Sequence, residues 1–77
     1  MNTIQTEWVS FAEQCIPDNA PTIQIQEMRR AFYAGALSVM MLLSDTEQQT
    51  NEAAQIMVEN FCAELAQFQK DVEEGRA

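Results

Sequence analysis

The sequence predicts an all-α protein in which a short N-terminal helix precedes a long antiparallel helical hairpin, assembled into a helical-bundle oligomer. Apolar residues recur at steps of three and four in three segments, and no segment alternates clearly with period two. Glycine and proline number only two each, so little interrupts these segments. With 77 residues, the chain is expected to form one helical domain over residues 1–77.

The first helix is predicted over residues 3–15. Its apolar stripe consists of Ile4, Trp8, Phe11, Ala12 and Cys15. Thr3 can act as the N-cap, since its hydroxyl can accept from the free amides of the first turn. The helix should end near Ile16, because Pro17 disfavours helical geometry in the residue before it. The segment "IPDNAP" then predicts a turn-rich loop.

The second helix is predicted over residues 22–43. Residues spaced by four and three form a seam for packing on another helix: Met28, Phe32, Gly35, Val39 and Leu42. The half after Phe32 is apolar on nearly all sides, so it should be buried on most of them. Two short partner helices cannot cover that much apolar surface, and this is the main indication of an oligomer.

The third helix is predicted over residues 46–73. Ser44 with Glu47 three residues later matches a capping box, and Thr50 offers an alternative start. The seam continues through Ala54, Val58, Phe61, Leu65, Phe68 and Val72. This spacing favours near-antiparallel pairing with the second helix. Gly75 can terminate the helix.

The charge of the chain excludes several classes of partner. The net charge is −8, with only four basic residues, which argues against direct nucleic-acid binding and against anionic membrane surfaces.

The sequence shows neither a signal peptide nor a membrane span. The first residues are polar and acidic, unlike a signal peptide, and the longest apolar run, residues 31–43, is too short for a membrane span. We therefore expect a cytoplasmic protein.

The sequence predicts no catalytic residues, metal site or cofactor. It has no histidine, so no serine or cysteine has the usual general base, and the commonest metal ligand is missing. The two cysteines, Cys15 and Cys62, cannot complete a zinc site by themselves. We expect them to be buried free thiols; a disulfide between the first and last helices is the alternative.

Three residues are candidates for binding an anionic ligand: Arg29, Arg30 and Tyr33. Tyr33 follows Arg29 by one helical turn, so guanidinium and ring can meet on one flank of the helix. A guanidinium binds phosphate oxygens bidentately and an aromatic ring can stack on a nucleobase. A symmetric assembly would duplicate these groups around a ligand. The alternative is that the arginines neutralise acidic helix faces, as in an i,i+3 pair of Arg30 with Glu27.

Four further residues are candidates for an interface. Ala31, Gly35 and Ser38 are small residues that narrow one face of the second helix. Met41 is a candidate for an exposed apolar residue that contacts another copy. Gly costs roughly 1 kcal/mol relative to Ala inside a helix. Close approach of another helix, in the hairpin or across a dimer, would compensate for that cost.

The string "IQEMRRAFYAGALSVMMLLS", followed by an acidic segment and "AELAQF", resembles a family of small uncharacterised phage and prophage proteins. The family's core reads E-x-R-R-A-F-x-A-G-A, followed by an apolar run and an E-L-x-x-F pattern. The resemblance covers roughly residues 24–69. The matching positions are Glu27, Arg29, Arg30, Ala31, Phe32, Ala34, Gly35, Ala36, Glu64, Leu65 and Phe68. It implies a phage context, in which genes of this size often encode non-enzymatic inhibitors of host defence.

Two functional hypotheses follow, together with a simpler alternative. In the first, an oligomer sequesters an anionic host signal such as a cyclic nucleotide through Arg29, Arg30 and Tyr33. In the second, the acidic surface binds a host defence protein, with electrostatic steering of the association. The simpler alternative is a structural or regulatory module that only associates with itself.

Overall fold

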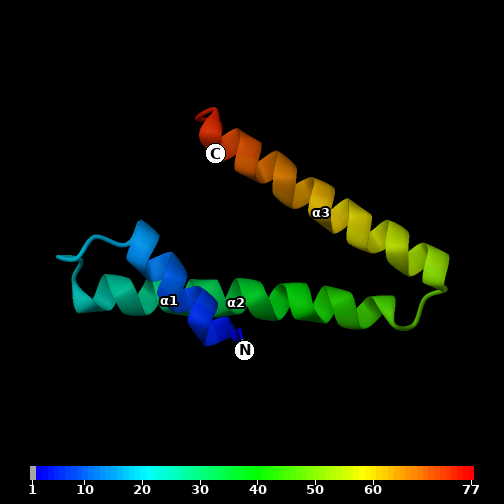
Figure 1. Ribbon diagram of the computed structural model, residues 1–77, viewed down its shortest axis with the longest axis horizontal. Helices are drawn as coiled ribbons and strands as arrows, with labels where there is room; N and C mark the ends of the chain where they lie inside the picture. The colour runs from blue at the N-terminus through cyan, green and yellow to red at the C-terminus, as the bar shows by residue number, and fades with distance from the viewer. Residues whose placement is uncertain (1) are drawn as a thin grey trace. The chain divides into compact units, whose positions relative to one another are not determined.

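The computed structural model describes residues 2–77 and contains three α-helices (Figure 1). They are α1 (Ile4–Cys15), α2 (Thr22–Thr46) and α3 (Asn51–Glu73). The predicted all-α class and the order of one short and two long helices are confirmed. The chain divides into two compact units, Met1–Met40 and Met41–Ala77, and α2 extends from the first into the second. No helix within residues 2–77 has the length and hydropathy that crossing a membrane requires.

Both ends of α1 lie where the sequence predicts. Thr3 and Thr6 form a reciprocal cap: the Thr6 amide donates to the Thr3 hydroxyl at 3.1 Å, and the Thr3 amide donates to the Thr6 hydroxyl at 2.8 Å. Two orphan amides of the first turn are satisfied in this way. At the other end, Ile16 is extended (φ −107°, ψ 124°), as expected for a residue before proline.

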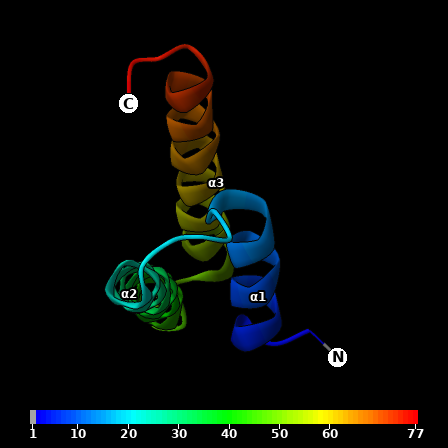
Figure 2. The ribbon, with the colours of Figure 1, turned by 90° about the vertical axis from the view of Figure 1, so that its left-hand side faces the viewer.

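An aromatic cluster attaches α1 to the first half of α2. Trp8 is only 7 % exposed, and its ring centroid lies 5.9 Å from that of Phe11 on α1 and 5.6 Å from that of Phe32 on α2. The Phe11 and Phe32 centroids are 5.4 Å apart. Figure 2 shows α1 beside α2. Trp8 is the one buried apolar residue among residues 2–77, so this three-ring cluster is the core of the first unit.

The boundary between α2 and α3 differs from the predicted one. Helix α2 continues to Thr46, and α3 begins at Asn51 rather than near residue 46. The capping box predicted at Ser44 is therefore wrong, because Ser44 lies inside α2 and its carbonyl accepts from the Glu47 amide in a following turn. The alternative start is confirmed: Thr50 is extended and its hydroxyl accepts from the Ala53 amide at 3.2 Å.

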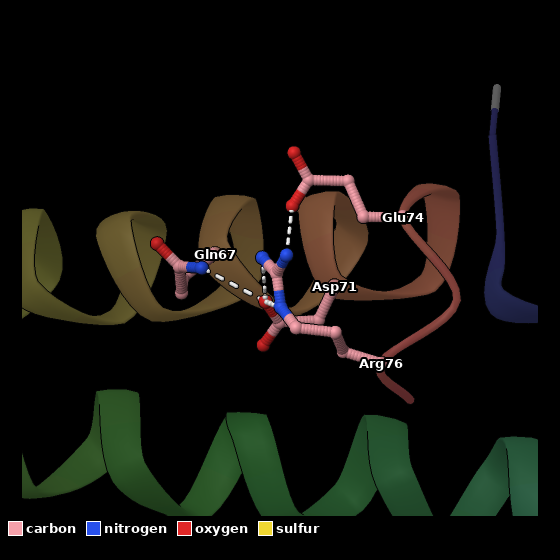
Figure 3. A network of polar contacts seen from close by, with 4 residues as sticks. All are labelled: Gln67, Asp71, Glu74 and Arg76. Carbon is pink, nitrogen blue, oxygen red and sulfur yellow. Dashed lines mark hydrogen bonds and ion pairs between the residues drawn. The ribbon is translucent and has the colours of Figure 1, made fainter.

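A glycine-dependent cap ends α3, as the sequence predicts. Gly75 has φ +77°, its amide donates to the Val72 carbonyl at 3.1 Å, and the Arg76 amide donates to the Asp71 carbonyl at 2.7 Å. These two bonds define a Schellman motif. The Arg76 guanidinium lies 2.8 Å from the Asp71 carboxylate and also contacts that of Glu74. Figure 3 shows these side chains. The arginine thereby offsets negative charge at the carboxyl end of the helix, where acidic residues are unfavourable.

Many large apolar side chains are exposed. On α2, Leu37, Met40 and Met41 are 62 %, 56 % and 61 % exposed, and in the predicted seam of α3, Leu65 and Phe68 are 62 % and 60 % exposed. The antiparallel pairing of the two long helices and the bundle oligomer stay predictions.

Both cysteines are free, but the prediction that they are buried is wrong. Cys15 is the last residue of α1, beyond the aromatic cluster, and Cys62 lies about 100° around the helix from Phe61, outside the seam of α3. Neither position is covered, so both thiols are exposed.

The aromatic cluster predicts a large and selective loss of stability on truncation of Trp8. Trp8→Ala should lower the free energy of unfolding by about 3 kcal/mol, because it removes the one buried side chain of residues 2–77 and leaves a cavity between Phe11 and Phe32. Urea unfolding followed by circular dichroism measures the change. Val9→Ala, at the neighbouring exposed position of α1, is the control and should change stability by less than about 1 kcal/mol. Equal losses in both variants would show that the cluster is not the core.

The observed start of α3 predicts different effects for two hydroxyl residues. Thr50→Ala should destabilise the protein by about 1 kcal/mol, because the Ala53 amide loses its acceptor. Ser44→Ala should cost less than about 0.5 kcal/mol, because Ser44 is an exposed residue inside α2. The same urea titration compares the two. A greater loss for Ser44→Ala would favour the helix start near residue 46.

Candidate functional site

The three candidate ligand residues lie together around one depression on α2. Its lining consists of Gln26, Arg29, Arg30 and Tyr33, and its volume is about 290 Å³. These residues occupy positions i, i+3, i+4 and i+7, which share one side of a helix. Arg29 and Arg30 point about 100° apart at the backbone, yet both long side chains reach the same depression. The depression is wide open to solvent.

Arg29 and Tyr33 meet as their spacing predicts. The central guanidinium carbon of Arg29 lies 5.5 Å from the centroid of the Tyr33 ring, within range of a cation–π interaction. The Tyr33 ring also packs edge-on against Phe32, with centroids 6.2 Å apart. Because Phe32 belongs to the aromatic cluster, Tyr33 is held from behind by the core while its side chain stays partly exposed.

Arg30 forms the predicted i,i+3 ion pair with Glu27, but the pair is weak. The nitrogen and oxygen atoms are 3.7 Å apart, and the side chains are 67 % and 65 % exposed. An exposed pair of this kind contributes between zero and about 1 kcal/mol. Arg29 has no ion pair among residues 2–77. Among the described residues, charge neutralisation therefore accounts weakly for Arg30, and no ion pair accounts for Arg29.

Gln26 belongs to the depression but was not among the candidates from the sequence. Helical spacing could have identified it, because it precedes Arg29 and Arg30 by three and four positions. Glutamine is common on exposed helix faces, so its residue type alone does not indicate a binding site. Residue type does distinguish the other three lining residues, because basic and aromatic side chains are rare in this chain.

A second hollow in the first unit has a different chemistry. It lies between the start of α1 and the middle of α2, and its volume is about 510 Å³. Its lining residues are Asn2, Thr3, Ile4, Glu7, Phe32 and Ala36. The single charged group there is the Glu7 carboxylate, so this hollow would repel an anion. The depression at Arg29 and Arg30 is the better candidate for an anionic ligand.

The candidate interface residues are exposed on α2. A Cβ atom added at Gly35 would meet nothing within 4 Å, so no side chain of the first unit packs closely on this glycine. The Ser38 hydroxyl donates to the Ala34 carbonyl at 3.0 Å, and Ala31 and Met41 lie open to solvent. Their role in an interface between copies stays a prediction.

In comparisons with known proteins, no family model, curated protein or solved structure matches this chain. The resemblance to small phage proteins therefore depends on the motif in α2 and α3 alone.

Proposed function

We propose that this protein is a non-enzymatic, phage-type inhibitor of host defence that binds an anionic signalling nucleotide and sequesters it in an oligomer. One observation supports this most: Arg29, Arg30 and Tyr33 line a single open depression, with the Arg29 guanidinium over the Tyr33 ring. Two of the four basic residues of a chain with a net charge of −8 are concentrated there. The remaining charged residues of the chain are 12 acidic residues and two basic ones, Lys70 and Arg76, so most of the other charge would repel such a ligand.

The chemistry of the lining matches the parts of a nucleotide. Each guanidinium presents several N–H donors in a fixed plane and can bind two phosphate oxygens at once. The Tyr33 ring offers a flat face on which a base can stack. The lining residues include no histidine, carboxylate, serine or cysteine, the side chains that most often act as general base or nucleophile. This combination favours binding without turnover, which is the chemistry of a sequestering protein.

Exposed apolar residues on α2 support self-association of the protein through the side of the helix that carries the depression. Leu37 and Met40 follow Tyr33 by four and seven positions, so the side of α2 that carries the depression continues as an apolar strip. Both side chains are more than half exposed, and Met41 lies beside them. A second copy packed on this strip would also provide the second wall that the open depression lacks. Assembly and ligand binding would then use one continuous surface.

The proposed assembly predicts that Met41 contributes to self-association. The native protein should sediment as a multiple of 8.7 kDa, and Met41→Lys should shift it toward the monomer, because a charge at an apolar contact must be desolvated. Gln48→Lys, an identical charge change in the exposed segment between α2 and α3, is the control. Analytical ultracentrifugation with circular dichroism distinguishes dissociation from unfolding. A native protein that is monomeric at all concentrations would contradict the proposed assembly.

The proposed binding site predicts that nucleotide binding depends on both arginines. Isothermal titration calorimetry with a panel of cyclic dinucleotides, cyclic oligonucleotides and ADP-ribose-type signals should detect at least one ligand. Arg29→Ala and Arg30→Ala should each weaken its binding about tenfold or more, because each removes charge-assisted bonds to phosphate.

Arg76→Ala provides the matched control, since it removes one positive charge from the end of α3. Its affinity should equal that of the native protein. If no ligand in the panel gives heat, or if all three variants weaken binding equally, the proposed site is wrong.

A further inference from the structure

We propose that Gln26 determines which nucleobase the depression accepts, and that it favours adenine over guanine. This inference depends on the proposed nucleotide binding and adds a selectivity to it. Gln26 lines the same depression as the two arginines and Tyr33, but it has neither their charge nor their aromatic ring. A neutral carboxamide binds a phosphate less strongly than a guanidinium does. We therefore assign Gln26 to the nucleobase, whose donors and acceptors a carboxamide can recognise.

The order of the lining residues along α2 assigns a part of the ligand to each. Gln26 precedes the arginines by about one helical turn and Tyr33 follows them by about one turn. At a rise of about 1.5 Å per residue, the seven positions from Gln26 to Tyr33 span about 10 Å along the helix. A ligand whose phosphates lie at Arg29 and Arg30 can stack one base on Tyr33. A second base on the opposite side of the phosphates would then reach Gln26.

The carboxamide of Gln26 is free to form such contacts. Four other helical glutamines use theirs locally: Gln14, Gln24, Gln55 and Gln67 each donate to a residue four positions away. The position four residues after Gln26 is Arg30, which has only donors. The Gln26 side chain has no hydrogen-bond partner among residues 2–77 and is exposed.

The donor and acceptor pattern of a carboxamide matches adenine. Its oxygen accepts from the N6 amino group while its nitrogen donates to N7, which gives a bidentate contact. The equivalent edge of guanine presents two acceptors, O6 and N7, so the carboxamide oxygen would face an acceptor and one bond would be lost. Gln26 therefore distinguishes the two purines by a hydrogen bond and not by size.

Calorimetry with cyclic di-AMP and cyclic di-GMP tests this selectivity. The native protein should bind cyclic di-AMP about tenfold more tightly, the discrimination expected of one bidentate contact in an open site. Gln26→Leu should reduce the ratio of the two dissociation constants to about one and keep α2 helical, because leucine is a good helix former. Gln24→Leu is the matched control, because Gln24 lies on the same helix but does not line the depression.

Each outcome has a distinct meaning. A ratio lost in Gln26→Leu and retained in Gln24→Leu supports the assignment. Binding by the native protein with a ratio near one, or a ratio that Gln26→Leu leaves unchanged, overturns the role of Gln26 and leaves the proposed function standing. Absence of binding to both nucleotides overturns the assignment to adenine. In that case the wider panel of signalling nucleotides decides separately whether the proposed function also fails.

Discussion

Contact between three aromatic rings is the interaction on which the first half of this protein depends. Trp8 and Phe11 meet Phe32, and Trp8 is the one buried apolar side chain of residues 2–77. The described side-chain hydrogen bonds are all local, joining residues at most five positions apart, so they cannot attach α1 to α2. The cluster also contacts the candidate site, because the Phe32 ring packs against the Tyr33 ring, and the Arg29 guanidinium lies over that ring.

The small amount of buried surface bears on the proposed function, because apolar residues that stay exposed are available for contact with another copy. A chain of 77 residues buries a modest share of its surface, and this one leaves large apolar residues open on both long helices. On α2, the side that carries the polar depression continues into the apolar residues Leu37 and Met40. Because α2 carries both the depression and the apolar residues, helix geometry sets the distance between them. That distance does not depend on how separate helices pack.

Local patterns in the sequence predict this structure well, and features that depend on covering surfaces are predicted poorly. The periodicity of apolar residues identifies all three helices, and Pro17 and Gly75 mark two helix ends through backbone geometry. The start of α3 was harder to predict, since Ser44 and Thr50 both satisfy capping patterns and the extent of α2 decides between them. The exposure of Cys15 and Cys62 depends on what packs over them. For the site, residue type identified the arginines and tyrosine, whereas Gln26 required the geometry of the depression.

The position of the aromatic residues also gives the protein intrinsic optical labels. Its single tryptophan lies in the core of the first unit, and its single tyrosine lies at the candidate site. Helix α3 contains neither, although it contains two phenylalanines. Ultraviolet fluorescence therefore reports on the environment of α1 and the first half of α2, while α3 contributes almost no signal. Far-ultraviolet dichroism sums all three helices, so the two methods observe different parts of the same chain.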